Sequence, residues 1–576
     1  MTTFTMGRTS AIGALALCLF LAGCKTSAPK SGAKTPKVDQ FFARWDHADS
    51  PGAAVVVVKN GAVVYQHGYG SANLESRVPI TPQTAFDAAS VAKQFTGLSI
   101  AMLIEQGKLS LDDDIRKHRR DVPDFGHTIT IRHLLYHTSG LRDWPETLGL
   151  SGFGDGAIIT LDTTLEMVRR QQELDFVPGE EQQYCNTSYN LLAAAIAKVS
   201  GKSFREWTDA NLFEPLGMKH THFCEDPTKL IPNRAESYSP AGEKKYNRNL
   251  SELAAQGSSS LFITAEDMGK WLINFQTERV GGRNAFGRMY EPGKLNGGKK
   301  LDFNYGFGVV LGDYHGARMI SHGGAWAGYR SFVLHIPEKQ FGVAILSNTS
   351  DMREAGIATK IADLYLGHSS PAKKPAAPAT NSIAAGKIEP TLWDAYLGTY
   401  RLGSGWLLEI TREGDHLNAQ ATHEDKFKMT PVSDTTFFVQ AYGASVEFVR
   451  SKSGPTTHLL YKGIRAPRLE LSKPTPTSLQ VYVGDYWSEE LRVAYRVEIR
   501  DGELGGRDRS GTWVRLLPTG PDRFDLDQGH ASVQFTRNAA SEITELKFSG
   551  GRIRNIRFLR SALPRPEKGS VVSASQ

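Results

Sequence analysis

The chain has 576 residues, of which 40% are hydrophobic and 22% are charged, a composition typical of globular rather than disordered proteins. This length exceeds what a single hydrophobic core supports, so we expect two to four domains. The formal net charge of +6 is small for the length, and the Lys and Arg residues are scattered instead of gathered on one element, which argues against a nucleic-acid-binding protein.

The first 23 residues are predicted to be a signal peptide. Arg8 supplies a positive charge, and the apolar run over residues 11–23 is too short to span a bilayer comfortably. The run ends in Leu-Ala-Gly followed by Cys24, which resembles the lipobox of bacterial lipoproteins and implies that Cys24 becomes the lipid-bearing N-terminus. An ordinary signal peptide or membrane anchor with an incidental Cys24 is the alternative. The Ser-, Lys-, Pro- and Ala-rich sequence that follows favours the lipoprotein, so we expect a tether over residues 24–40.

Residues 41–368 are predicted to form one domain that mixes strands and helices. Two β-branched runs surround Asn60-Gly61, which is a strong hairpin signal. Helical patterns then dominate to about residue 275. Strand patterns return at residues 305–312, 329–337 and 341–348. Strands at both ends with helices between them predict that the terminal strands share one antiparallel sheet.

A Pro- and Ala-rich linker is predicted over residues 369–390. Beyond it the chain shows short strands and turns, and it repeats itself. The stretch Tyr396–Tyr400 recurs at Tyr482–Tyr486 with a displacement of 86 residues, and Ala444–Arg450 recurs at Ala531–Arg537 with a displacement of 87. Two matches at nearly one spacing predict two copies of an all-β unit, each large enough for a small antiparallel barrel. The barrels are expected over residues 391–475 and 476–565, with a tail over 566–576.

Ser90 and Lys93 are the candidate nucleophile and base. The chain has four Ser-x-x-Lys pairs; three lie in the tether and the linker, and only Ser90/Lys93 begins a predicted helix. Residues three apart on a helix are neighbours, so the amine can reach the hydroxyl. A helix N-terminus also favours the negative charge that develops during acyl transfer. Burial would lower the pKa of this lysine toward neutrality. An exposed lysine and a helix-capping serine would be the better interpretation if this motif stood alone.

Two further motifs accompany it, each present once. Tyr184 and Asn186 form a Tyr-x-Asn motif before an Ala/Leu-rich helix, and His322 and Gly324 form a His-x-Gly motif just before a strand. The order of the three motifs resembles that of the penicillin-recognising serine hydrolases, which include class C β-lactamases, D-Ala-D-Ala carboxypeptidases and D-aminopeptidases. The resemblance covers roughly residues 41–368. It implies a β-lactamase/transpeptidase-like domain, an antiparallel sheet with a helical subdomain, in a multidomain α+β chain. The two small all-β barrels that follow this domain resemble the β domains of D-aminopeptidases.

The resemblance also implies a role for each motif residue. Ser90 would form an acyl-enzyme, and Lys93 and Tyr184 would share the general acid–base work. Asn186 would orient Lys93 and bind the substrate amide. The oxyanion hole would consist of the backbone N–H groups of Ser90 and Ala325.

The third motif departs from the class C β-lactamases, which usually carry lysine where this chain has His322. We expect His322 to be a weaker, pH-dependent cation, which puts firm capture of a β-lactam carboxylate in doubt. Gly324 lacks a Cβ atom and would let the acyl group lie close to the strand. A competing Lys-Ser-Gly sequence at residues 452–454 lies inside the first β copy, so His322 is preferred.

Two histidine groupings and a cysteine pair were weighed as other sites. His133 and His137 stand four apart on a predicted helix, and residues 220–224 gather two histidines and a cysteine. Packing is favoured over metal binding in both cases. No acidic residue lies between His133 and His137, and both stretches are part of the family resemblance. We therefore expect no metal and no cofactor. The sequence does not decide whether Cys185 and Cys224 form a disulfide.

The sequence as a whole predicts a cell-envelope serine hydrolase held by a lipid anchor on the periplasmic side of a bacterial membrane, with the outer membrane favoured. Small peptides that contain D-amino acids are the expected substrates, and an esterase or a weak class C-type β-lactamase is the alternative. A non-catalytic envelope-binding protein is the second alternative. The membrane and a small peptide or ester are the expected partners, nucleic acid is not, and the sequence does not indicate an oligomeric state.

Overall fold

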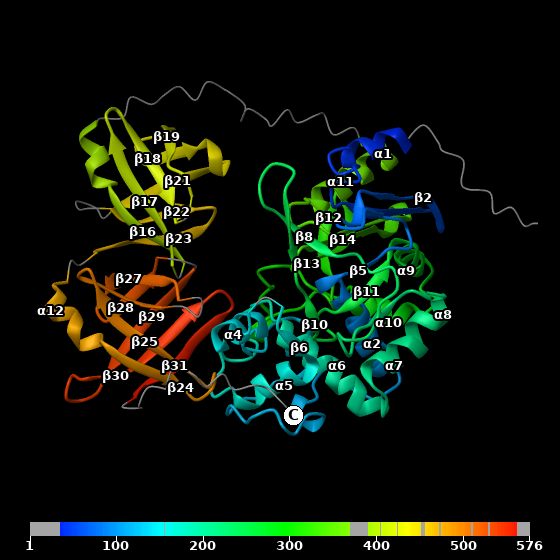
Figure 1. The fold of residues 1–576 in the computed structure, drawn as a ribbon, viewed down its shortest axis with the longest axis horizontal. Coiled ribbons are helices and arrows are strands. Elements are labelled where there is room, and N and C mark those ends of the chain that lie inside the picture. Colours follow the sequence, from blue (N-terminus) through cyan, green and yellow to red (C-terminus); the bar gives the residue numbers. More distant parts are fainter. Residues whose placement is uncertain are drawn as a thin grey trace, which may run out of the picture.

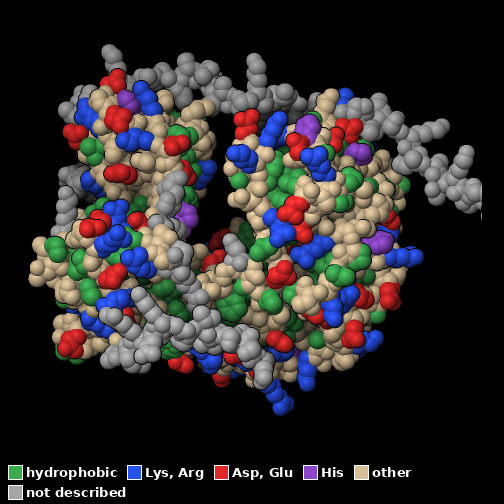
Figure 2. Space-filling model, in the orientation of Figure 1, with side chains coloured by type: hydrophobic (Ala, Val, Ile, Leu, Met, Phe, Trp, Pro, Cys, Tyr) green, Lys and Arg blue, Asp and Glu red, His purple; other side chains and the backbone are tan. Residues whose placement is uncertain are grey.

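The computed structural model describes residues 35–154, 156–368, 390–403, 405–422, 424–450, 456–471, 474–507, 511–527 and 530–561. The predicted signal peptide, Cys24, the first part of the tether, nearly all of the linker and the tail lie outside these residues. A large mixed domain, blue to green in Figure 1, stands beside two barrels, yellow-green and orange to red. The space-filling view shows that this face of the molecule is hollowed between the barrels and the mixed domain (Figure 2).

A six-stranded sheet in the order β12-β13-β14-β15-β1-β2 forms the centre of the mixed domain, and every neighbouring pair is antiparallel. Its strands are β1 (Ala53–Lys59), β2 (Ala62–Tyr69), β12 (Val310–Tyr314), β13 (Ala317–Trp326), β14 (Tyr329–Ile336) and β15 (Phe341–Ser347). β1 pairs with β15 along its whole length, so the predicted meeting of the terminal strands is confirmed. The predicted hairpin is also confirmed: Asn60 and Gly61 turn the chain with φ of 52° and 74°, values that Asn-Gly tolerates well.

Helices cover both faces of this sheet, so β1 is buried on both sides. Alternate residues of a strand point to opposite faces. Val55 and Val57 pack against α1 (Thr35–Phe42) and α11 (Glu354–Leu366), whereas Val56 and Val58 belong to the larger core on the other face.

The position of α1 corrects the predicted tether. Val38 and Phe42 of this helix are fully buried, so the mixed domain begins at α1 and the expected tether is wrong over residues 35–40. The helix is short, and its few apolar residues stand beside a stretch with linker composition, which hid it in the sequence.

The larger core lies in the helical part of the domain, which also holds the site. Its helices are α2 (Lys93–Glu105), α3 (Ile131–Leu135), α4 (Trp144–Ser151), α5 (Leu161–Arg170), α6 (Asn186–Ser200), α7 (Phe204–Thr208), α8 (Glu214–Leu216), α9 (Ala265–Thr277) and α10 (Gly282–Met289). Short strands join them: β3 (Ser71–Asn73), β4 (Val78–Pro79), β5 (Ala85–Asp87), β6 (Ile158–Thr160), β7 (His222–Phe223), β8 (Ser237–Pro240), β9 (Tyr246–Asn249), β10 (Glu252–Ala254) and β11 (Leu261–Thr264). No helix in the described ranges is long and apolar enough to cross a membrane.

The C-terminal part consists of two closed eight-stranded barrels, as the repeat predicts. The first contains β16 (Gly398–Gly403), β17 (Trp406–Glu413), β18 (His416–Ala421), β19 (Phe427–Pro431), β20 (Thr436–Val439), β21 (Ala444–Arg450), β22 (Thr456–Tyr461) and β23 (Ile464–Leu469). The second follows α12 (Pro476–Leu479) and contains β24 (Gly484–Ser488), β25 (Val493–Arg500), β26 (Glu503–Arg507), β27 (Trp513–Gly520), β28 (Arg523–Leu526), β29 (Ala531–Arg537), β30 (Ile543–Gly550) and β31 (Ile553–Ser561).

The repeated tyrosines explain the first sequence match between the barrels. The Tyr400 hydroxyl donates to the Tyr396 carbonyl at 2.8 Å, and the Tyr486 hydroxyl donates to the Tyr482 carbonyl at the same distance. Tyr400 and Tyr486 are each fully buried. The second match gives the sixth strand of each barrel, β21 and β29.

Candidate active site

Ser90 lies in a single 3₁₀ turn, η1 (Ala89–Ala92), that leads directly into α2. The turn follows β5, and the Asp87 carboxylate at the end of that strand accepts a hydrogen bond from the Ala89 N–H at 2.8 Å. Ala89 has a φ of +46°, a left-handed conformation that is uncommon for a residue with a side chain. Lys93 is the first residue of α2 and is fully buried. The predicted helix start is therefore right, but the serine occupies the turn before the helix.

Lys93 connects the Ser90 turn to the rest of the site. Its Nζ atom lies 3.1 Å from Ser90 Oγ, 2.7 Å from Asn186 Oδ1 and 2.8 Å from the Ser258 carbonyl oxygen. Burial lowers the pKa of Lys93 well below its ordinary value; the Asp143 carboxylate acts against this shift and the Arg552 guanidinium adds to it. A buried amine whose charged form is disfavoured can accept a proton from the hydroxyl beside it.

Tyr184 and Asn186 reach the same place from the start of α6. The Tyr184 hydroxyl is buried and makes no hydrogen bond of full geometry within the described residues, although its ring lies 4.8 Å from Lys93 Nζ. Burial raises the pKa of Tyr184, and the nearby Ser90 hydroxyl partly offsets the rise. The tyrosine is thus a neutral hydrogen-bond donor that faces the serine and has no bound acceptor among the described residues.

Asp143 fixes Asn186, and the sequence motifs did not point to it. Its Oδ1 accepts the Asn186 backbone N–H at 2.6 Å, and its Oδ2 accepts the Asn186 side-chain amide at 3.1 Å. The carboxylate is completely buried, and burial raises its pKa to about 7 while Arg552 acts to lower it. Asp143 follows the His-Thr-Ser-Gly-Leu-Arg stretch in the sequence, where a lone aspartate before a tryptophan carries no recognisable signal.

His322 does not serve as the cation that the sequence suggests. Its Nδ1 lies 2.7 Å from the Gly323 carbonyl oxygen and donates to it, and its Nε2 lies 2.8 Å from the Tyr305 hydroxyl. In the neutral ring, Nε2 accepts from this hydroxyl. Burial lowers the pKa of His322 to about 3, and Lys93 contributes to the shift. The expectation of a pH-dependent cation near neutrality is therefore wrong, because the ring is buried between hydrogen-bond partners.

Gly324 brings β13 against the Ser90 turn. A Cβ atom at this position would lie 2.3 Å from the Ala88 carbonyl oxygen and 2.3 Å from Ser331 Oγ, and 3.1 Å from the Ser90 backbone nitrogen. Only glycine fits so close an approach. Ala325, the next residue on the strand, lines the same cleft, and its part in an oxyanion hole with the Ser90 N–H stays a prediction.

His137 is a second buried ring that the sequence did not assign to the site. It lies beyond α3 with a φ of +60°, so His133 and His137 do not share one helix and the expected helical pair is wrong. His137 Nδ1 accepts the Cys185 N–H at 3.0 Å, and its ring centroid is 4.3 Å from that of Tyr184. Burial lowers the pKa of His137 well below its ordinary value, so it packs against the tyrosine as a neutral ring.

The cysteines are packing residues in this structure. Cys185 and Cys224 are both buried free thiols and form no disulfide. Burial raises the pKa of the Cys185 thiol to about 12, which makes it a poor nucleophile. No group of three or more His, Cys, Asp or Glu side chains with metal-binding geometry occurs in the described part of the chain.

These residues surround a cleft of about 480 Å³. Every predicted substrate-side residue lines it, and Lys93 lies beneath its floor. The lining residues are Ala89, Ser90, Trp144, Pro145, Tyr184, Asn186, Ser259, His322, Gly323, Gly324, Ala325, Trp326, Glu354 and Arg552.

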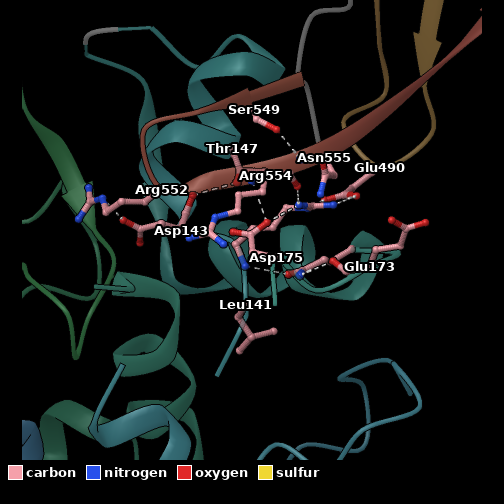
Figure 3. Close-up of polar contacts among 12 residues, drawn as sticks. Leu141, Asp143, Thr147, Glu173, Asp175, Glu490, Ser549, Arg552, Arg554 and Asn555 are labelled. Carbon is pink, nitrogen blue, oxygen red and sulfur yellow. Dashed lines mark hydrogen bonds and ion pairs between the residues drawn. The ribbon is translucent and has the colours of Figure 1, made fainter. Parts of the chain in front are cut away.

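Arg552 is the one lining residue that comes from outside the mixed domain. It stands at the tip of the β30–β31 hairpin of the second barrel, and Figure 3 shows it extending toward Asp143. Sequence reasoning missed it, since a lone arginine in a barrel hairpin gives no sign of which surface the hairpin meets.

Comparison with known proteins agrees with this fold and site. A family model described as Beta-lactamase matches residues 38–366. Penicillin-binding protein 4* of Bacillus subtilis is 27% identical over 423 residues, which are 71% of this chain and 92% of the relative. A D-aminopeptidase of Brucella anthropi is 28% identical over 523 residues, 88% of this chain and 95% of the relative. A D-aminopeptidase of Gluconobacter oxydans is 30% identical over 326 residues, and this match covers only 59% of the relative's length.

A solved structure supports the fold independently. The octameric penicillin-binding protein homologue from Pyrococcus abyssi superposes with a TM-score of 0.54 at 23% identity, over 82% of this chain and 98% of that one. The fold and the relatives together define a serine hydrolase. Within that class, the chain belongs to the beta-lactamase family, with penicillin-binding proteins and D-aminopeptidases among its relatives.

Proposed function

We propose that the chain is a cell-envelope peptidase that forms an acyl-enzyme on Ser90 and acts on small peptides containing D-amino acids. One observation carries the catalytic part of this proposal. Lys93 Nζ is fully buried, lies 3.1 Å from Ser90 Oγ and has a pKa well below its ordinary value. An amine in this position is suited to take the proton of a serine that attacks a carbonyl carbon.

The reaction divides into acylation and deacylation. Ser90 Oγ attacks the carbonyl carbon while Lys93 takes its proton, and the carbonyl oxygen becomes an oxyanion held by the N–H groups of Ser90 and Ala325. The intermediate collapses by breaking the C–N bond; Tyr184 donates its proton to the leaving amine and takes up the proton that Lys93 holds. A water molecule then attacks the ester carbon while Lys93 takes one of its protons, and this proton passes to Ser90 Oγ as the C–O bond breaks and the free acid leaves.

The substrate class is supported by the relatives and by His322. A relative named D-aminopeptidase aligns over 88% of this chain, so the alignment extends into the barrels. His322 is neutral, with a pKa lowered to about 3, so β13 offers no imidazolium to hold the carboxylate of a β-lactam. An esterase or a weak class C-type β-lactamase is the alternative, and capture of a ligand without turnover is the second.

Intact-protein mass spectrometry separates these possibilities. Wild type and Ser90→Ala are incubated with D-Ala peptides, β-lactams and p-nitrophenyl acetate. We expect a covalent adduct only in the wild type, and turnover fastest with the D-Ala peptides. An adduct on Ser90→Ala would refute Ser90 as the nucleophile. Turnover fastest with β-lactams or p-nitrophenyl acetate would refute the substrate class. Stoichiometric binding without turnover would favour the non-catalytic alternative.

The location on the cell envelope rests on the sequence alone. We propose that Cys24 carries the lipid that holds the enzyme at the membrane. Metabolic labelling with palmitate should mark the wild type and not Cys24→Ser, and equal labelling of both would refute the anchor.

A further inference from the structure

The β30–β31 hairpin places a cation at the edge of the catalytic cleft. Gly551, with a φ of +55°, turns the chain at the tip, and Arg552 follows it. Arg552 Nε lies 2.9 Å from Asp143 Oδ2 and 2.9 Å from Glu146 Oε1, and its guanidinium lies 5.5 Å from the centre of the Tyr184 ring. The side chain is 34% exposed, while Asp143 is fully buried.

An ion pair followed by hydrogen bonds leads from this arginine to the nucleophile. Arg552 forms an ion pair with Asp143 Oδ2 and donates its Nε–H to Glu146, and both oxygens of Asp143 accept from Asn186. Asn186 Oδ1 in turn accepts from Lys93, whose amine reaches Ser90. Asp143 accepts from both groups of Asn186 best as a carboxylate, since protonation reduces the acceptor capacity of one oxygen.

Arg552 is also the cation that balances Asp143. Without it, the nearest cation for this buried carboxylate would be Lys93 itself, and a protonated Lys93 cannot act as a base. A positive charge close to two titrating groups favours their deprotonated forms. Arg552 therefore favours the state in which Asp143 is a carboxylate and Lys93 is a neutral amine.

The other groups around the pair do not supply this charge. The titratable groups that face it are Glu146 on α4, Tyr184 and Cys185 at the start of α6, His137 beyond α3 and His322 on β13. Both histidines are buried with lowered pKa values, the tyrosine and the thiol have raised pKa values, and Glu146 is an acid. Arg552 is thus the one permanent cation among the described residues that face the pair.

The hairpin is held firmly enough to fix this arrangement. The Arg554 backbone N–H donates to Asp175 Oδ1 at 2.9 Å, and the Gln183 side-chain amide donates to the Arg552 carbonyl oxygen at 2.9 Å. Arg142, which is 1% exposed, lies between Asp175 of the mixed domain and Glu490 of the second barrel, at 2.6 Å from each. Figure 3 shows Asp175, Glu490 and Arg554 along one seam between the two parts.

We propose that Arg552 is a positioning residue of the hydrolase site, supplied by the second barrel, which acts through Asp143 on Asn186 and Lys93. The barrel is by this proposal a part of the active site and not an appended module. The proposal rests on the roles of Ser90 and Lys93 proposed above.

The test follows the pH dependence of acylation by p-nitrophenyl acetate in the full-length protein. Removing the cation in Arg552→Gln should raise the apparent pKa of the acid limb of the pH–rate profile by about one unit. The acylation rate should then fall about tenfold at pH values below the limb, since a nearby charge shifts a pKa by one unit or more. Arg552→Lys keeps the charge and should restore most of the limb. Glu146→Gln removes an anion from the residues that face Asp143 and Lys93, so it should shift the acid limb of the pH–rate profile in the opposite direction, to lower pH.

Arg554→Gln is the matched control. It removes a cation two residues away that pairs instead with Glu181 at 2.9 Å and does not line the cleft, so the acid limb should stay in place. The proposal is overturned if Arg552→Gln slows acylation without moving the limb, or if Arg552→Gln and Glu146→Gln move it in the same direction. If Arg552→Gln fails to fold, Glu146→Gln alone decides, because a limb that stays or rises in that variant contradicts the proposal.

Failure of this inference is distinguishable from failure of the proposed function. An inactive Ser90→Ala protein with an unshifted limb in Arg552→Gln would overturn only the role of Arg552. Acylation that persists in Ser90→Ala would overturn the function on which the role depends.

Discussion

Replacing Glu490 by alanine should loosen the contact between the second barrel and the mixed domain. Glu490 follows β24 of the barrel, and its carboxylate accepts from Arg142 Nε at 2.6 Å and from Nη2 at 3.4 Å. Arg142 is 1% exposed, so water cannot replace the lost oxygens. Asp175 and the Arg554 carbonyl remain as acceptors, but both contact Nη1. The variant leaves two charged donors of Arg142 buried without acceptors.

The magnitude follows from that geometry. Breaking a buried ion pair by removing one partner costs about 3–5 kcal/mol, and about 1.4 kcal/mol corresponds to a factor of ten in an equilibrium constant. The opening of the seam should therefore become at least about a hundredfold more frequent. The backbone N–H of Arg554 reports this opening directly, because its hydrogen bond to Asp175 crosses the seam at 2.9 Å.

Hydrogen–deuterium exchange of peptides covering residues 551–557 is the assay. Exchange in Glu490→Ala should accelerate by about two orders of magnitude, while peptides from β29 inside the barrel keep their wild-type rate. The control is Glu489→Ala, whose carboxylate is exposed and, among the described residues, accepts only from Trp487 Nε1, at 3.1 Å. Equal exchange rates at residues 551–557 in Glu490→Ala and Glu489→Ala would refute the idea that the ion pairs of Arg142 hold the barrel in place.

Three further predictions concern the cleft. Tyr184→Phe should retain the fold and lower kcat by about 10²–10⁴, measured with the best substrate of the panel, and a loss below about tenfold would exclude it as the general acid. His322→Asn should leave the shape of the pH–rate profile between pH 5 and 8 unchanged, because the pKa of His322 is lowered to about 3; a limb that disappears in the variant would show that His322 titrates there. Burial raises the pKa of Asp87 to about 6 from an ordinary value of 3.8, so the contribution of Asp87 to stability should fall as the pH rises from about 4 to 6. Over this range, the free energy of unfolding of Asp87→Asn, which keeps an oxygen for the Ala89 N–H, should fall less than that of the wild type in urea unfolding, and parallel pH curves would contradict this.

The parts of the fold that follow from local patterns were predictable. Asn60-Gly61 between β-branched runs specifies a hairpin because few other residues tolerate both turn positions. The burial of β1 on both faces matches its unbroken apolar run. The tyrosine and strand matches at nearly equal spacing gave two barrels, because a duplicated sequence keeps its packing positions.

The site was predictable only where its residues lie close together in the sequence. Ser90 lies in the turn just before α2 and Lys93 is the first residue of that helix, so the three-residue spacing brings their side chains together. Tyr184 and Asn186 lie at the start of α6 and are only two residues apart in the sequence. Asp143 and Arg552 meet across two domains, and no periodicity records which surface a barrel hairpin contacts. The charge of His322 depends on burial by Tyr305 and its neighbours, a property of the packed domain that the motif does not carry.

The position of Arg552 in the β30–β31 hairpin, near the C-terminal end of the second barrel, also has a consequence for how the site is completed. Synthesis runs from the N-terminus, so the Ser90 cleft emerges long before the second barrel. The turn that carries Arg552 precedes β31, and β31 closes the barrel by pairing with both β30 and β24. The β30–β31 hairpin that carries Arg552 is complete only when this last strand has paired. If Arg552 has the role proposed above, the catalytic site is complete only when the second barrel has closed.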